Sequence, residues 1–169
     1  GLTHNIETIL HAASRVQSYQ DITFLMIGDG PKKKWAEQFI REKGLKNVIL
    51  LPWQPEDRLP HTFSAADIGI VTLGQNADTI SVPSKTYHYL AAGAALMAIA
   101  GPDSEVADLV RKYDCGASVV PGDADNMVDL ILKVKSDPEL LKSYKDNARK
   151  ASLDFGKDNT ARFYQYVGS

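Results

Sequence analysis

The chain has 169 residues, of which 44% are hydrophobic and 24% charged, which is typical of one soluble globular domain with a sizeable core. A formal net charge of −2 excludes the basic footprint of a nucleic-acid-binding protein. Cys115 is the only cysteine, which excludes an internal disulfide, favours a reducing cytoplasm and makes a buried spectator thiol the simplest interpretation.

The chain opens with a helix, whereas an α/β domain normally opens with a strand. Ile6, Ile9 and Ala13 repeat at helical spacing behind Asn5, which we expect to cap the helix. Residues 22–27 are a continuous apolar run that predicts a strand buried on both faces. Two explanations of the early helix remain: the domain starts irregularly, or the chain is a fragment cut just after a first strand. We favour the fragment.

A tight turn at Gly28–Pro31 leads from this strand into a helix that carries Trp35 and Phe39. Residues 32–34 are three lysines in the first helical turn, where positive charge opposes the helix dipole. A bound anion would explain them, and so would an ordinary solvated surface, which we favour. The turn lacks the third glycine and the downstream acid of a dinucleotide fingerprint, so it gives little support for NAD.

Residues 47–51 predict the next strand, which leads into the rigid loop Pro52–Pro55. Trp53 in this loop could form the wall of a base pocket or could simply pack against the protein. A short helix and a strand at residues 68–73 follow.

The stretch from Ser81 to Gly93 is the centre of the sequence argument. A polar loop after the strand at 68–73 ends at Pro83 and Ser84, which start a helix whose apolar face is predicted to hold Tyr87, Leu90, Ala91 and Ala94. Free N–H groups and the dipole make such a helix start an anion site, and Lys85 adds a full charge. The pattern predicts a bound phosphate, and a solvated lysine on an ordinary strand–loop–helix is the alternative.

Strands at 96–100 and 117–120 alternate with helices, and only helices follow them. The predicted fold class is therefore α/β, a doubly wound parallel (Rossmann-like) sheet with a helical carboxy-terminal tail.

The order of these motifs resembles the carboxy-terminal, nucleotide-sugar donor domain of a group 1 (GT-B fold) glycosyltransferase. The matching pieces are Phe24–Pro31, Val48–Pro55, Ala65–Ile68 and Pro83–Gly93, and Cys115-Gly116 followed by Pro121-Gly122-Asp123 is similar to the tail of the same domain. The Pro-Ser-Lys form at residue 83 is closest to a subgroup of bacterial surface-polysaccharide enzymes. The resemblance implies that residues 1–169 are a single nucleotide-sugar-binding domain, half of a GT-B fold, without the amino-terminal acceptor domain and the first strand.

The resemblance also assigns donor contacts. Gly28 and Gly30 would border the nucleotide cleft, and Trp53 and Gln54 would meet the base. The diphosphate would lie against Ser81, Val82, Pro83, Ser84 and Lys85, and His88 would contact the ribose. The family usually has two glutamates where this chain has Ile80 and His88. Without the two carboxylates the chain lacks the strongest hydrogen-bond acceptors at these positions, although a histidine still forms hydrogen bonds. No catalytic residue is assigned.

The implied function is transfer of a sugar from a nucleoside-diphosphate sugar, expected to be UDP-linked, to a glycan or lipid-linked acceptor. The resemblance implies that the configuration of the anomeric carbon is retained and that no metal or cofactor is needed. The isolated fragment would be inactive, and the full-length protein would be cytoplasmic, peripheral to the inner membrane. Asp123-Ala124-Asp125 has the form of a metal motif, but helix capping accounts for both acids. The alternative is a non-catalytic binding or scaffold module that has lost the donor site. Exposed aromatics at the end of the chain, Phe163, Tyr164 and Tyr166, are predicted to favour fragment dimers.

Overall fold

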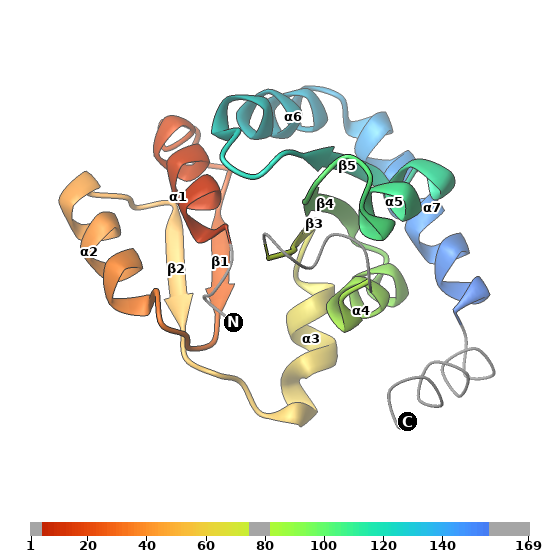
Figure 1. The fold of residues 1–169 in the computed structure, drawn as a ribbon, viewed down its shortest axis with the longest axis horizontal. Helices are drawn as coiled ribbons and strands as arrows, with labels where there is room; N and C mark the ends of the chain where they lie inside the picture. Colours follow the sequence, from red (N-terminus) through yellow and green to blue (C-terminus); the bar gives the residue numbers. More distant parts are fainter. Residues whose placement is uncertain (1–4, 75–81, 156–169) are drawn as a thin grey trace.

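The computed structural model describes residues 5–74 and 82–155, shown as a coloured ribbon in Figure 1. The strands of this part are β1 (Phe24–Ile27), β2 (Val48–Leu51), β3 (Ile68–Thr72), β4 (Ala95–Ile99) and β5 (Gly116–Val119). The helices are α1 (Ile6–Arg15), α2 (Lys33–Lys43), α3 (Leu59–Ser64, after the 3-10 turn η1 at Glu56–Arg58), α4 (Ser84–Ala92), α5 (Glu105–Tyr113), α6 (Ala124–Ser136) and α7 (Pro138–Asp154). None of the helices in these two ranges has the length and apolar character needed to cross a membrane.

Every strand pairing within the described ranges is parallel, as the sequence predicts, but the pairings form two sheets. β1 pairs with β2 from Phe24 opposite Val48 to Ile27 opposite Leu51. The second sheet has the order β3-β4-β5, with Ile68 opposite Ala95. In Figure 1 the two sheets lie on opposite sides of the view, with β1 and β3 as their inner strands.

The three-stranded sheet is covered on both faces, which confirms the doubly wound arrangement there. Met97, Ile99 and Val119 pack into one hydrophobic cluster together with α1 and α6. Val71 and Leu96 belong to a second cluster, which includes residues of α5 and α7. All five residues of β4 are buried because this strand has a partner on each side and packed side chains on each face.

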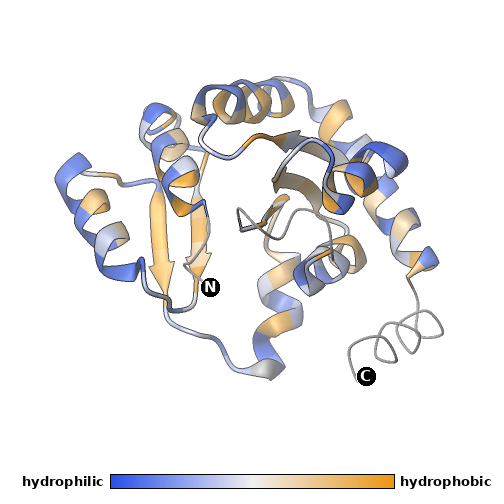
Figure 2. Cartoon of the chain, in the orientation of Figure 1, coloured by the Kyte–Doolittle hydropathy of each residue, from blue (hydrophilic) through white to orange (hydrophobic). Residues whose placement is uncertain are grey.

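The expectation that β1 is buried on both faces is wrong. Phe24 and Val48 point into the first cluster, but Leu25 and Ile49 on the other face are 45% and 46% exposed. β1 and β2 are hydrophobic along their whole length in Figure 2. A continuous apolar run therefore predicts a strand, but it does not show that both faces of that strand are covered. Within the described residues, only the face toward α1 and α2 is packed.

Two local predictions also need correction. Asn5 has a φ of 53° and makes no capping hydrogen bond; its side-chain nitrogen donates to the Leu73 carbonyl instead. In α4, Ala91 is exposed and Thr86 is buried beside Leu90, since the helix turns its buried face toward α7 and β3. At the end of the described residues, Phe155 is the C-cap of α7. Phe163, Tyr164 and Tyr166 lie outside the described residues.

Candidate functional site

The predicted site residues fall into two groups, each at the carboxyl edge of its own sheet. Gly28 and Gly30 follow β1, and Trp53 and Gln54 follow β2. The second group is at the start of α4: Val82, Pro83, Ser84, Lys85 and His88. No hydrogen bond, ion pair or ring contact among the described residues joins one group to the other. Ser81 lies outside the part of the chain that the structure describes.

The loop after β1 is tied down by its own ion pairs. Gly28 is buried with a φ of 114°, which favours glycine, and its N–H donates to the Leu51 carbonyl at 3.0 Å. The Lys32 ammonium lies 2.5 Å from the Glu7 carboxylate of α1, and Lys33 pairs with Asp29. Neither of these two lysines therefore needs a bound anion to balance its charge.

These pairs also shift the ionisation of their members. Partial burial opposes ionisation of Glu7, but the hydrogen bond and charge of Lys32 outweigh it and lower the pKa of the carboxyl. The hydrogen bond and charge of Asp29 raise the pKa of Lys33. The two pairs connect the Gly28 loop to α1 and to the first turn of α2, so the loop is held in one conformation.

Trp53 is 64% exposed, so the interpretation that it packs against the protein is wrong. Its neighbour Gln54 is half-buried and donates from Nε2 to the Pro52 carbonyl at 2.9 Å. The exposed indole of Trp53, beside the hydrogen-bonded amide of Gln54, is a flat apolar surface on which an aromatic ring can stack.

The start of α4 has donors without a cap. Pro83 is the N-cap residue, with extended ψ of 138°, and no side chain caps the helix among the described residues. The N–H of Thr86 is used by the Pro83 carbonyl at 2.9 Å, which leaves the amides of Ser84 and Lys85 at the helix end. Lys85 is exposed and makes no ion pair in the described part of the chain. This is the local geometry of an anion site.

Thr86 adds a feature that the sequence analysis did not single out. Its side chain is fully buried, and its Oγ1 has no hydrogen-bond partner within the described residues. A buried hydroxyl without a partner costs stability, so this group in the first turn of α4 is available to a polar neighbour. A threonine next to a helix start gives no sequence signal of its burial.

His88 is held by an aromatic neighbour. It is exposed, and its ring stacks on Phe63 of α3 with centroids 5.0 Å apart and an interplanar angle of 22°. Phe63 also packs edge-to-face with Tyr89, at 4.9 Å and 85°. The Tyr89 ring in turn covers Gly69 in β3, where an added methyl group would lie within 2.6 Å of Cδ2. The ring of His88 is thus fixed in orientation while its edge faces solvent, and sequence reasoning missed both Phe63 and Tyr89.

Lys85 lines neither of two grooves on the described part of the chain. A groove of about 490 Å³ is lined by Val82 together with Tyr87, Tyr113 and Phe155, on the α5 and α7 side of α4. A second, of about 510 Å³, lies beside Tyr19 and α6. Val82 is the single predicted site residue that lines either of these two, and it is buried in the second hydrophobic cluster. The start of α4 is therefore not part of the lining of these two grooves, apart from Val82.

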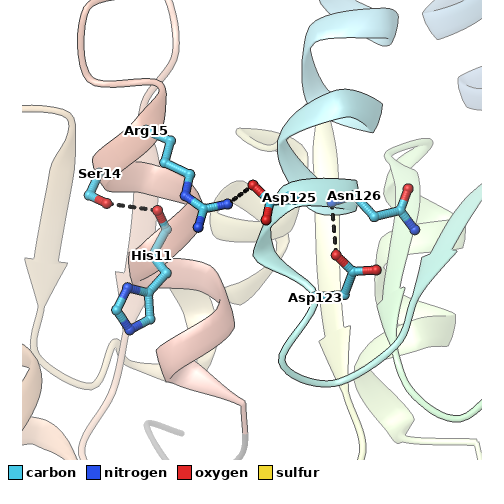
Figure 3. Close-up of polar contacts among 6 residues, drawn as sticks. All are labelled: His11, Ser14, Arg15, Asp123, Asp125 and Asn126. Carbon is cyan, nitrogen blue, oxygen red and sulfur yellow. Dashed lines mark hydrogen bonds and ion pairs between the residues drawn. The ribbon is translucent and has the colours of Figure 1, made fainter.

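Two features that the sequence raised have structural roles. Asp123 caps α6 by accepting a hydrogen bond from the Asn126 amide at 3.0 Å, and Asp125 pairs with Arg15 of α1, as Figure 3 shows. No cluster of metal-ligating side chains occurs among the described residues. Cys115 is fully buried, and burial raises the pKa of its thiol to about 11, as expected for a spectator.

Comparison with protein families decides the wider assignment. Residues 2–151 match the family model described as "Glycosyl transferases group 1". The chain belongs to this family. WcaI of Escherichia coli K12, which is named as a colanic acid biosynthesis glycosyl transferase, is 26% identical over 113 residues, or 67% of this chain. WbjE of Pseudomonas aeruginosa, named as a glycosyltransferase, is 25% identical over 131 residues. The chain spans 28% of WcaI and 32% of WbjE.

Solved structures of glycosyltransferases share this fold, which is that of the GT-B enzymes. HepE of Anabaena, solved in complex with UDP-glucose, superposes with a TM-score of 0.76 at 17% identity, over 96% of this chain and 45% of HepE. The carboxy-terminal domain of the group 1 glycosyl transferase LpcC of Francisella tularensis gives a TM-score of 0.72 at 19% identity, over 90% of this chain and 79% of that domain. The group 1 domain is thus the α/β half-domain that the sequence motifs indicate.

Proposed function

We propose that this group 1 domain binds the nucleoside-diphosphate-sugar donor of a glycosyltransferase, with the donor's diphosphate at the start of α4. The observation that carries the proposal is the N-terminus of α4, which no described side chain caps, with the exposed Lys85 beside it, which has no ion-pair partner among the described residues. Exposed amides and a lysine at a helix start favour two negative phosphates over any neutral ligand. HepE, solved with UDP-glucose, and GtfA, solved with UDP and GlcNAc, support a uridine nucleotide as the first donor to test.

The remaining contacts follow from the same placement. The exposed indole of Trp53 offers a surface for the base, and Gln54 in the same loop offers polar backbone and side-chain groups beside it. His88, kept in orientation by its stack on Phe63, would donate or accept a hydrogen bond with a ribose hydroxyl. In this proposal Gly28 and Gly30 border the nucleotide, and the buried Val82 supports the loop through packing alone.

Chemically, the residues of this chain would stabilise the leaving diphosphate. As the bond between the sugar and the diphosphate breaks, negative charge grows on the phosphate oxygens, and the α4 amides and Lys85 would stabilise it there. The proposal places this domain as the carboxy-terminal half of a retaining enzyme whose acceptor site is on an amino-terminal domain. The isolated chain would then bind the donor without turnover.

Isothermal titration with UDP and UDP-sugars tests the proposal. Lys85→Met should weaken UDP binding by about ten- to a hundredfold, since a charge-assisted contact contributes roughly 1.5–3 kcal/mol. Lys43→Met is the matched control: Lys43 is also exposed, but it lies at the far end of α2 and should leave affinity unchanged. Absence of binding at millimolar UDP, in this chain and in the full-length protein, would overturn the proposal.

A second candidate function is a binding or scaffold module without a working donor site. The observation in its favour is the absence of glutamate at the positions of Ile80 and His88. His88→Glu separates the two functions, because a carboxylate is the stronger acceptor for ribose hydroxyls. A clear gain in UDP affinity supports a genuine donor site, whereas no effect together with no wild-type binding supports the module.

A further inference from the structure

Aromatic side chains line a groove among α4, α5 and the end of α7. α7 packs against both α4 and α5, and the three helices lie together on the right of Figure 1. The groove has a volume of about 490 Å³, within the range of roughly 300–1,000 Å³ that is typical of small-ligand sites. Its rings are those of Tyr87 in α4, Tyr113 at the end of α5 and Phe155, the C-cap of α7. Val82, which directly precedes the N-cap of α4, also lines the groove and connects it to the start of that helix.

The three rings hold one another in place. The centroid of the Phe155 ring lies 4.9 Å from that of Tyr87 and 5.8 Å from that of Tyr113. The hydroxyl of Tyr113 donates to the Asp154 carboxylate at 2.8 Å, and Nζ of Lys112 lies 5.0 Å from the centroid of the Tyr113 ring. All three aromatic side chains are half-buried, so each keeps part of its surface accessible. They form a preorganised apolar wall, and a ligand that binds there needs to immobilise little of the protein.

Charged side chains of both signs line the same groove. Glu105, Asp108 and Lys112 of α5 are all exposed. Burial, and after it the charge of Glu105, raise the pKa of the Tyr87 phenol, which indicates that this carboxylate lies close to the aromatic wall. Asp108 pairs with Arg111, but a carboxylate has lone pairs for more than one donor. The groove therefore offers hydrogen-bond acceptors and donors along an apolar surface.

Few classes of ligand fit this combination of groups. A hydrocarbon chain would take water from the charged side chains without replacing their hydrogen bonds. A phosphate would meet two carboxylates and one ammonium among the lining residues, which on balance repel it. A neutral pyranose ring has a face of C–H groups that can pack on an aromatic ring, and its hydroxyl groups both donate and accept hydrogen bonds. A neutral sugar therefore matches both the apolar and the polar parts of the lining.

We propose that this groove binds a neutral pyranose segment of a glycan, at a site separate from the donor contacts. The C–H face of one sugar ring packs on the wall formed by Tyr87, Tyr113 and Phe155. The sugar hydroxyls donate to the Glu105 carboxylate and accept from the Lys112 ammonium. This inference does not depend on the proposed function, because none of these five side chains is a proposed donor contact.

Titration with maltotriose and cellotriose, two neutral trisaccharides that differ in linkage, tests the proposal when it is followed by the amide NMR signals of the chain. At least one of them should bind, with the largest shifts at the lining residues of α4 and α5. Glu105→Gln should weaken binding by about three- to tenfold, because a neutral acceptor replaces a charged one. Glu139→Gln is the matched control, since Glu139 is also an exposed acid in the first turn of a helix but does not line the groove.

A second pair of variants tests the aromatic wall. Tyr113→Leu should weaken binding by about three- to tenfold, because it removes a flat ring and keeps an apolar side chain. Tyr19→Leu is the matched control: the Lys135 ammonium lies 5.4 Å from the Tyr19 ring, much as Lys112 lies over Tyr113, but Tyr19 lines the other groove. Trigalacturonate, an acidic trisaccharide, should bind about tenfold or more weakly than the neutral ones, because the lining carries more negative than positive charge.

Other outcomes would overturn the proposal. The groove is not a glycan site if neither neutral trisaccharide binds at tens of millimolar, or if the shifts centre on Trp53 and Lys85 instead. Equal losses in the test and control variants would show that the substitutions do not act through the groove. Equal affinity for the acidic trisaccharide would contradict the charge argument. UDP affinity should be the same in all four variants, and an absence of UDP binding would count against the donor proposal alone.

Discussion

Substitution of Gly69 by alanine tests the packing that supports His88. Gly69 lies in the middle of β3, and the ring of Tyr89 lies directly over its Cα. An alanine Cβ would be 2.6 Å from Cδ2 of that ring and closer to Cγ, whereas carbon atoms in contact are about 3.5–4.0 Å apart. The ring must move by about 1 Å, and it cannot do so without disturbing its edge contact with Phe63.

Gly69→Ala should destabilise the chain by about 2 kcal/mol. Overpacking of this kind costs roughly 1–3 kcal/mol, and loss of the aromatic contact adds roughly 0.5–1.5 kcal/mol. The lower backbone entropy of alanine in a strand offsets roughly 0.5–1 kcal/mol. For a chain of this size the expected fall in Tm is about 4–8 °C.

Urea unfolding followed by circular dichroism measures the effect, and Tyr89→Ala supplies the second arm of a double-mutant cycle. Without the ring there is space for the new methyl group, so Gly69→Ala should then cost less than about 0.5 kcal/mol, giving a coupling of about 2 kcal/mol. An equal cost of Gly69→Ala in both backgrounds would refute the steric argument. If His88 contacts the donor, Gly69→Ala should also weaken UDP binding, because it displaces the helix that carries His88.

Three further predictions concern other parts of the fold. Gly116→Ala should destabilise the chain by about 3–5 kcal/mol in urea unfolding, because the new Cβ would lie 2.7 Å from the backbone carbon of Leu96; Gly122→Ala, which meets no atom within 4 Å, is the matched control, and equal losses would contradict the reasoning. Cys115 should resist a thiol reagent at pH 8 until the chain unfolds, since its pKa is raised to about 11; rapid labelling of the folded chain would exclude its burial. Because the pKa of Glu7 is lowered in the folded chain, its pair with Lys32 stabilises the fold above the unfolded pKa of about 4.3, and this stability is lost as the pH falls through the folded pKa. Glu7→Gln should therefore make Tm depend less steeply on pH below about pH 5. The effect should be small because both side chains are partly exposed, and an unchanged dependence of Tm on pH would contradict the reasoning.

The sequence by itself determined the elements and their order. Apolar runs such as residues 48–51 and 95–99 specify strands with at least one buried face, because hydrophobic side chains are driven out of water. Helix starts at Asp123 and Ser104 follow from side-chain oxygens that satisfy free amides a few residues away. Motif order then indicated a group 1 glycosyltransferase domain, and the family match over residues 2–151 confirms the family.

Only the tertiary structure decided which faces are covered and which charges are paired. Leu25 and Leu96 look alike in sequence, yet one is exposed and the other buried, because burial depends on elements that are distant in the chain. The same holds for Lys32, which Glu7 neutralises, and Lys85, which has no ion-pair partner in the described residues. The stack of His88 on Phe63 also depends on a long-range contact, which no local pattern specifies.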